Sequence, residues 1–280
     1  MFLPPQAVPV GFSLGAVLCW GTSDFLGGYA SRTANSVLIT TITNACGFLA
    51  IITVAILSGS SVPPLHNAAW ALAGGVFGGS ALAVFYRALS GGNMGLTAPV
   101  SAILAAAIPA VYGIFVEGLP RTAQIIGFIL AAFGIWLISR SDQAGKPRGI
   151  GLAVIAGTGF AGFFICSKQA GMGSVFWLAA ASRLAAFVCT AMWTLVTKSF
   201  RPAKVSSLRW GVVAGFIDVS GTVSFFRSLQ TGRLDTASVL ASLYPVVTVL
   251  LARIVLKEQF TGWKIAGLVA ALAAVPLIAA

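Results

Sequence analysis

The segment FYRALSGG at residues 85–92 has a near copy, FFRSLQTG, at residues 225–232, which is 140 positions later. Other matches occur in the same order at an offset of 136 or 140: Gly-Thr at 21–22 and 157–158, a small and a basic residue at 31–32 and 167–168, and Ile-x-Gly at 125–127 and 265–267. Glu117 and Glu258 are separated by nearly the same distance. A single match arises easily by chance, but an ordered series indicates that the chain is an internal duplication.

The composition is that of a membrane protein. The chain has 280 residues, of which 58% are hydrophobic and only 8% are charged, and its mean hydropathy is +0.96. A water-soluble domain carries roughly 25% charged residues. Long stretches lack Asp, Glu, Lys and Arg: 33–86, 88–116, 122–139, 236–252 and 265–280. About 20 apolar residues are needed for a helix to cross the bilayer, where backbone groups must be satisfied internally, so an all-α integral membrane protein is predicted.

Polar or Gly/Pro-rich breaks divide the chain into ten predicted transmembrane helices. The predicted spans are 9–30, 37–58, 67–90, 95–116, 122–139, 149–168, 174–197, 208–230, 236–256 and 262–279. Five spans fall in each copy, so the predicted repeat units are 9–139 and 149–279. Because five is odd, the second copy enters the membrane from the opposite side. This predicts two inverted five-helix repeats, an architecture that transporters use for alternating access around a central site.

The basic residues predict topology. The formal net charge is +11, but most Lys and Arg fall in short loops, which favours topology control and predicts no nucleic-acid partner. Twelve follow odd-numbered spans or adjoin those loops: Arg32, Arg87, Arg140, Lys146, Arg148, Lys198, Arg201, Lys204, Arg209, Arg253, Lys257 and Lys264. The other side holds four: Arg121, Lys168, Arg227 and Arg233. The positive-inside rule therefore predicts that both termini lie outside the cytoplasm.

The order of these features resembles a known family. Ten spans in two copies, the segment WGTSDF at 20–25, and the series Pro245, Glu258 and Gly267 are similar to the drug/metabolite transporter superfamily, specifically its EamA-type exporters. The resemblance covers residues 10 to 279. It implies a multi-pass carrier of the bacterial inner membrane that exports metabolites such as amino acids. The many aromatic residues look like those of the aromatic and neutral amino-acid exporters.

The chain departs from this family in two respects. Its fourth span has Pro99 and Pro109 where the ninth has the single Pro245, so bending is expected to differ between the copies. The family is usually drawn with cytoplasmic termini, whereas the loop charge places them outside.

No enzyme, metal or cofactor site is predicted. Gly145-Lys146-Pro147 lacks the remaining residues of a phosphate-binding loop, and the single histidine, His66, has no nucleophile and acid around it. The four cysteines have no metal-ligand spacing. Active transport would therefore use a gradient, with protons as the candidate coupling ion. The glycines of residues 74–79 lie inside an apolar span, where close helix packing is the predicted role.

Three charged residues lie within the predicted spans: Asp24, Arg183 and Asp218. A charge at the centre of a membrane helix costs roughly 2.5–3.5 kcal/mol, so such residues usually face a bundle interior or a water-filled cavity. Their counterparts in the other copy are uncharged: Phe160 for Asp24, Gly78 for Asp218, and Thr43 or Gly47 for Arg183. An asymmetric charge set suits a zwitterionic substrate.

These charges allow two hypotheses. In one, Arg183 binds an anionic group of the substrate and Asp24 or Asp218 meets a cation or a proton. In the other, Arg183 and an aspartate form a structural ion pair, since an unpaired buried charge is costly.

Aromatic and hydroxyl side chains complete the candidate substrate site. Mid-span aromatic residues are candidates to line an apolar pocket, with helix packing as the alternative: Trp20, Tyr86, Phe163, Trp177, Phe225 and Tyr244. Pro99 and Pro245 are candidate kinks, each of which frees a backbone carbonyl. Thr97, Ser101 and Ser242 lie beside them, where their hydroxyls either bind substrate or satisfy the freed backbone.

The sequence therefore predicts a secondary-active or facilitative exporter of small metabolites, most specifically aromatic or neutral amino acids. A carrier of sugars, phosphorylated sugars or drugs with the same fold is the alternative within carriers. A channel is less favoured because no continuous polar stripe is present, and a membrane scaffold because no sizeable soluble region is present. The expected partners are the small-molecule substrate and the lipid bilayer, and the expected oligomeric state is a monomer or weak homodimer.

Overall fold

The computed structural model describes residues 7–90, 94–138, 150–199, 204–256 and 261–279. Within these ranges the chain forms helices and no strand. The helices are α1 (Ala7–Ser31), α2 (Ser36–Leu57), α3 (Leu65–Ser90), α4 (Met94–Glu117), α5 (Thr122–Ile138), α6 (Ile150–Gln169), α7 (Val175–Val196), α8 (Val205–Thr231), α9 (Leu234–Ala241), α10 (Tyr244–Val255) and α11 (Gly262–Ala279).

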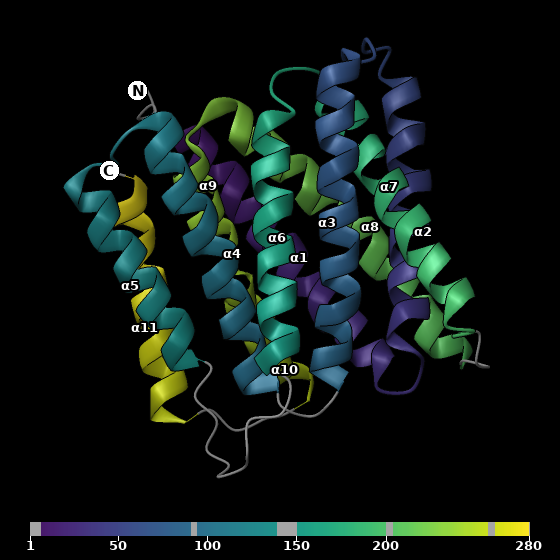
Figure 1. The fold of residues 1–280 in the computed structure, drawn as a ribbon. Helices are drawn as coiled ribbons and strands as arrows, with labels where there is room; N and C mark the ends of the chain where they lie inside the picture. Colours follow the sequence, from purple (N-terminus) through teal and green to yellow (C-terminus); the bar gives the residue numbers. More distant parts are fainter. Residues whose placement is uncertain (1–6, 91–93, 139–149, 200–203, 257–260, 280) are drawn as a thin grey trace.

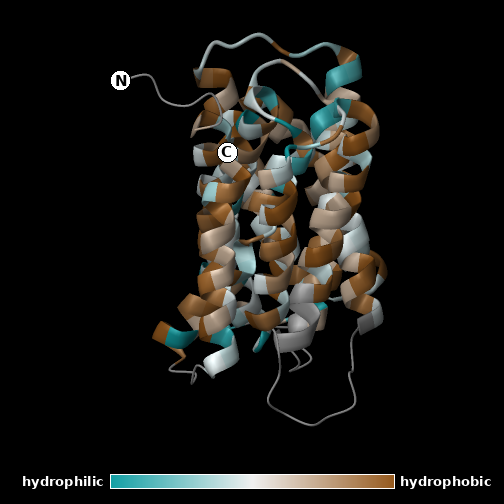
Figure 2. Cartoon of the chain, turned by 90° about the vertical axis from the view of Figure 1, so that its left-hand side faces the viewer, coloured by the Kyte–Doolittle hydropathy of each residue, from teal (hydrophilic) through white to brown (hydrophobic). Residues whose placement is uncertain are grey.

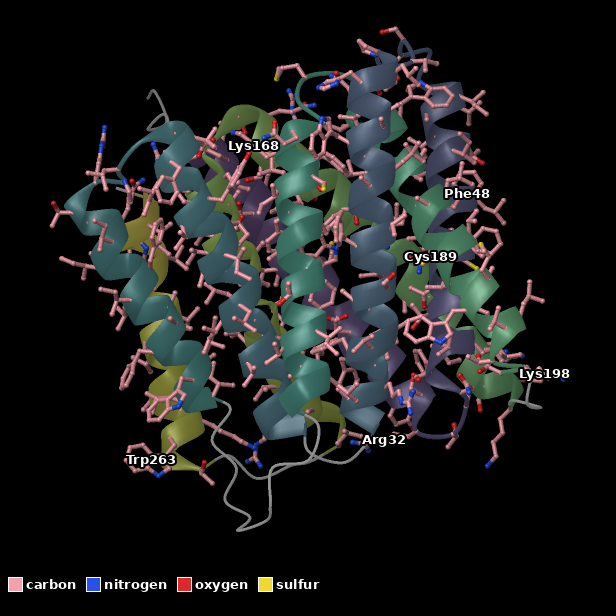
Figure 3. All side chains as sticks on the ribbon, in the orientation of Figure 1. Arg32, Phe48, Lys168, Cys189, Lys198 and Trp263 are labelled. Atoms are coloured by element: carbon pink, nitrogen blue, oxygen red, sulfur yellow. The ribbon has the colours of Figure 1, made fainter. Side chains whose placement is uncertain are left out.

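The helices form one bundle and run up and down between two ends (Figure 1). Helix α1 begins and helix α11 ends toward the upper end in Figure 1, which we call the terminal side. Lys168 lies toward this side, whereas Arg32, Lys198 and Trp263 lie toward the opposite side (Figure 3). The two groups of basic residues that the sequence separates are thus represented at opposite ends of the bundle.

Apolar residues dominate the middle of the bundle, and hydrophilic residues gather toward its ends (Figure 2). Among the described residues, eight helical segments are long and apolar enough to cross a membrane, with α9 and α10 forming one of them. The prediction of an all-helical membrane protein is confirmed. Helix α5 is shorter, at 17 residues, and α1 is long enough at 25 residues but carries several polar side chains. The count of ten spans stays a prediction.

The ninth predicted span is interrupted. Helix α9 ends at Ala241, and α10 begins at Tyr244 with Pro245 in its first turn. A proline cannot donate to the carbonyl four residues earlier, here that of Ala241, and its ring clashes with that carbonyl. The helix therefore stops at Ala241 and restarts at Tyr244, after two intervening residues. Helix α4, which contains two prolines, continues without a break.

Helices of the first half pack against helices of the second half, and the same pairs recur in both directions. Helix α1 packs against α8 and α10, and its counterpart α6 packs against their counterparts, α3 and α4. The corresponding helices α2 and α7 pack against each other, as do α5 and α11. Glycines mark equivalent contacts. A Cβ added at Gly21 would lie 2.5 Å from Val247 Cβ, and one added at Gly157 would lie 2.9 Å from Leu104 Cβ. The shared Gly-Thr segments therefore serve close helix packing in both halves.

The glycines at 74–79 bring α3 against α6 and α7. A Cβ added at Gly79 would lie 2.7 Å from Ala186 Cα, and one added at Gly75 would lie 2.9 Å from Ala185 Cβ. One added at Gly78 would lie 3.3 Å from the Phe163 ring. The absence of side chains at these positions permits the close approach, which is the packing role predicted for this segment.

Candidate functional site

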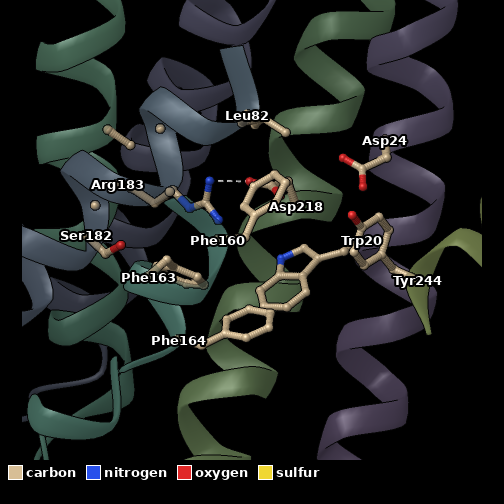
Figure 4. A pocket seen from close by; sticks show the side chains of 14 residues that line it. Trp20, Asp24, Leu82, Phe160, Phe163, Phe164, Ser182, Arg183, Asp218 and Tyr244 are labelled. Carbon is tan, nitrogen blue, oxygen red and sulfur yellow. Dashed lines mark ion pairs between the residues drawn. The ribbon is translucent and has the colours of Figure 1, made fainter. Parts of the chain in front are cut away.

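A cavity of about 60 Å³ lies between helices of both halves. At roughly 10–15 Å³ for one water position, it has room for only a few water molecules. Six of the sequence-predicted residues line it: Trp20, Asp24, Phe163, Arg183, Asp218 and Tyr244 (Figure 4). The rest of the lining is Gly75, Gly78, Gly79, Leu82, Phe160, Phe164, Ser182 and Ala186. The structure therefore brings together sequence-predicted residues from α1, α6, α7, α8 and α10.

Arg183 is held by a polar network on one wall of the cavity. Its guanidinium pairs with the carboxylate of Asp218 on α8 and donates to Thr222 Oγ1 one turn further along that helix. Its Nη1 also donates to Asn44 Oδ1 on α2 at 3.1 Å. The side chains of Arg183 and Asp218 are only 9% and 7% exposed. The network thus neutralises both buried charges and fixes the guanidinium from two other helices.

Asp24 lies on the other wall and is 6% exposed. Within the described part of the chain, its carboxylate has neither an ion pair nor a hydrogen bond. Figure 4 shows the carboxylate turned into the cavity, with the hydroxyl of Tyr244 pointing toward it. A buried carboxylate without a partner is unfavourable unless it gains a proton or a cation. Asp24 is therefore a carboxylate of this lining that is available to a ligand.

Aromatic rings fill the floor between these walls. The Trp20 indole stacks on Phe164, with ring centroids 5.9 Å apart, and lies 6.0 Å from Phe163. The candidate Phe225 is fully buried and does not line the cavity, but its ring supports the floor at 5.2 Å from Trp20. Phe164 and Phe225 are in turn 4.6 Å apart. Offset and edge-to-face ring contacts at such distances are favourable, so the cluster is a stable apolar surface in this conformation.

The structure places the other candidate residues elsewhere. Tyr86 on α3 is fully buried outside the cavity lining, and its hydroxyl donates to Ser23 O at 3.4 Å. Ser101 on α4 and Ser242 in the α9–α10 break are buried but do not line the cavity. Trp177 lies in the first turn of α7, and its indole N–H donates to Ser60 O in the loop after α2, away from the cavity. The side chains of Thr97 and Pro99 lie outside the described residues, although both positions belong to α4.

Two cavity residues that were not candidates are the repeat counterparts of those that were. Phe160 is the counterpart of Asp24, and Gly78 is the counterpart of Asp218. The internal duplication could have identified both residues, because corresponding positions of the two repeats lie at the same interface between the halves. Asn44 gave a weaker signal as a buried amide in an apolar span.

A second polar cluster joins the halves on the terminal side. Lys168 Nζ lies 2.8 Å from Glu117 Oε1 and donates to Gly232 O, also at 2.8 Å. Glu117 Oε2 accepts from the Leu234 N–H at 2.8 Å. This cluster, which we call the terminal-side latch, links the end of α4 to α6 and to the α8–α9 junction.

Arg233 extends the latch. It donates to Gly118 O at 2.6 Å and pairs with Asp235 at 2.6 Å. The hydrogen bond to Asp235 raises the pKa of the Arg233 guanidinium above its ordinary value. A cation whose pKa is raised by folding stabilises the folded state at every pH below its unfolded pKa. The contribution of this pair to stability therefore does not change across the physiological pH range.

The helices form a membrane bundle, and a cavity lined by charged and aromatic residues lies between its two similar halves. This arrangement is typical of a membrane transport protein. The model of the EamA-like transporter family matches residues 8–140 and 147–280, and the chain belongs to that family. A solved structure titled "Crystal structure of protein" is similar in fold, with a TM-score of 0.77 at 19% identity, covering 96% of this chain and 95% of that one. No curated protein sequence matches the chain.

Proposed function

We propose that this membrane transporter exports aromatic or neutral amino acids across the bacterial inner membrane by alternating access between two inverted repeats, 9–139 and 149–279. The observation that carries the proposal is the cavity, in which an available carboxylate, Asp24, faces a guanidinium, Arg183, above an aromatic floor. An amino acid presents an ammonium, a carboxylate and an apolar body, which these three features complement. The proposed orientation keeps the basic loops in the cytoplasm and the termini outside.

The small volume of the cavity supports a carrier cycle rather than an open pore. A cavity of about 60 Å³ is too small for an aromatic amino acid, since its volume corresponds to only a few waters. The aromatic floor must separate for substrate to enter, and rocking of one half against the other provides such a movement. A channel would instead require a continuous polar path, and its conductance in a planar bilayer would exceed the rate of a carrier cycle.

Uptake into proteoliposomes tests the proposal. We expect phenylalanine, tryptophan and leucine to be transported, sugars and sugar phosphates not to be, and an imposed proton gradient to change the rate. Empty liposomes and liposomes with an unrelated membrane protein provide the background. Uptake of a sugar phosphate without uptake of any amino acid would replace this substrate class with the alternative one.

Glu117→Gln tests the terminal-side latch in the proposed cycle. The substitution removes the ion pair with Lys168 but keeps an acceptor for the Leu234 N–H. Because the pair is partly exposed, we expect a loss of only about 0.2–1 kcal/mol of stability. If the latch closes the terminal side, however, the variant should spend more time open on that side.

Opening of the terminal side can be measured with Ser182→Cys, made in a chain whose native cysteines have been replaced. We expect a membrane-impermeant maleimide added on the terminal side to label this cysteine several-fold faster when Glu117 is Gln. Thr197→Ala, at the opposite end of the bundle, is the matched control. An unchanged labelling rate would show that the latch does not close the path.

A further inference from the structure

We infer that Asp218 occupies the place of the substrate's carboxylate on Arg183, so that a zwitterion binds there only when Asp218 takes up a proton. This inference rests on the proposed function. It assigns to Asp218 the coupling of substrate binding to protons, and it makes the ion pair part of the transport cycle.

The geometry places the pair where a substrate can reach it. Arg183 and Asp218 both line the cavity, and Arg183 is the only cation among its described lining residues. A substrate carboxylate in the cavity therefore has one cationic partner to bind, and that partner is already bound to Asp218.

Arg183 can change partners without losing its position. Asn44 on α2 and Thr222 on α8 accept its hydrogen bonds independently of the Asp218 carboxylate. Its Nε has no hydrogen-bond partner among the described residues. The guanidinium thus stays oriented toward the cavity and retains a free donor while one carboxylate replaces another.

Charge balance then determines which group takes up a proton when the substrate binds. When a zwitterion places its ammonium on Asp24 and its carboxylate on Arg183, two anions share one guanidinium if Asp218 remains ionised. Like charges in a poorly solvated site disfavour the second ionisation. The balanced step adds one proton to Asp218, which leaves Arg183 paired with the substrate and Asp24 paired with the ammonium. Release of the substrate reverses the step and returns the proton on the same side, so the substrate and the proton move together and export runs down the outward gradient of the substrate.

The groups around Asp218 leave it as the acceptor of this proton. Asp24 and Cys19 face it from α1, Tyr86 is close on α3, and Arg183 faces it from α7. Helix α2 contributes the Asn44 amide, and its Cys46 lies against Gly215, one turn earlier on α8. Helix α6 contributes phenylalanine rings, and the acid of α9 is paired with Arg233 on the terminal side. Asp24 is committed to the ammonium, so Asp218 is the remaining carboxylate.

Two ligands that differ by one carboxylate test the inference in the wild-type protein. Phenylalanine and phenethylamine both carry the ammonium and the ring, and both are fully charged at that ammonium between about pH 5 and 7. Any proton exchange at Asp24 is common to both ligands and cancels in their comparison. We expect phenylalanine binding to take up one proton more than phenethylamine binding, as measured by calorimetry in two buffers of different ionisation enthalpy.

The same one-proton difference should appear in the pH dependence of the affinities for the two ligands. The ratio of the phenylalanine Kd to the phenethylamine Kd should rise about tenfold per pH unit, since one additional proton is bound. In Asp218→Asn this ratio should become independent of pH, and phenylalanine should bind at least several-fold more tightly at pH 7. In Asp24→Asn both ligands should weaken while the one-proton difference persists.

Equal proton uptake by the two ligands in the wild type would overturn the inference while leaving amino-acid transport intact. Binding of phenethylamine without binding of phenylalanine would also overturn it, because Arg183 would then be closed to carboxylates. Failure of both ligands to bind, together with no amino-acid uptake, would reject the proposed function itself. The wild-type measurement decides the question even if Asp218→Asn folds poorly.

Discussion

Asp24→Asn is expected to lower amino-acid transport strongly at subsaturating substrate and to raise the melting temperature of the purified protein. The carboxylate of Asp24 is buried and has no ion pair or hydrogen bond within the described residues, so its negative charge is a cost to the fold. A hydrogen bond to a charged group contributes about 1.5–3 kcal/mol, so loss of the ammonium contact should weaken substrate binding roughly 10- to 100-fold. Counterflow in proteoliposomes and thermal unfolding in detergent measure the two effects.

The opposite signs of these effects make the prediction specific. Thr22→Ala is the matched control, because Thr22 lies on the same helix and, among the described residues, its hydroxyl bonds only to Leu18 O of that helix. It should leave both transport and melting temperature nearly unchanged. Asp24→Glu keeps the charge and should retain partial transport. A fall in melting temperature in Asp24→Asn, together with lost transport, would instead assign Asp24 a structural role.

The sequence predicted the parts of the fold that follow from hydropathy and from local backbone chemistry. The charge-free stretches predicted the helices, and Pro245 predicted a kink where the structure has the break between α9 and α10. Pro99 gives no such break in α4, although it is the same residue type in the corresponding span. Packing against neighbouring helices decides whether a membrane helix tolerates a proline, and local sequence does not contain that information.

The candidate site was predictable in part for a related reason. Intramembrane charges point to a cavity because of their cost, and Asp24, Arg183 and Asp218 all reach the same one. The choice between the two aspartates as the partner of Arg183 was not predictable, because it depends on helix rotation and separation. Trp177 failed to reach the cavity because it lies in the first turn of α7, where it contacts the loop after α2.

Arg183→Gln is expected to impair folding and to abolish transport, and a second substitution should separate the two effects. Removing one partner of a buried ion pair costs about 3–5 kcal/mol, since the other charge is left uncompensated. Arg183→Gln leaves the Asp218 carboxylate buried without its cation, and we expect a lower yield of monodisperse protein and a clearly lower melting temperature. Its hydrogen bonds to Asn44 and Thr222 are lost as well.

The double variant Arg183→Gln/Asp218→Asn removes both charges and keeps polar groups of similar size. Replacing a whole buried pair is often nearly neutral for stability, so its melting temperature should return close to that of the wild type. Transport of phenylalanine should remain absent, because no cation is left in the described lining of the cavity to bind the carboxylate. Binding of phenethylamine should persist, since that ligand needs only Asp24. Recovery of phenylalanine transport in the double variant would show that the pair serves the fold alone and that the substrate carboxylate binds elsewhere.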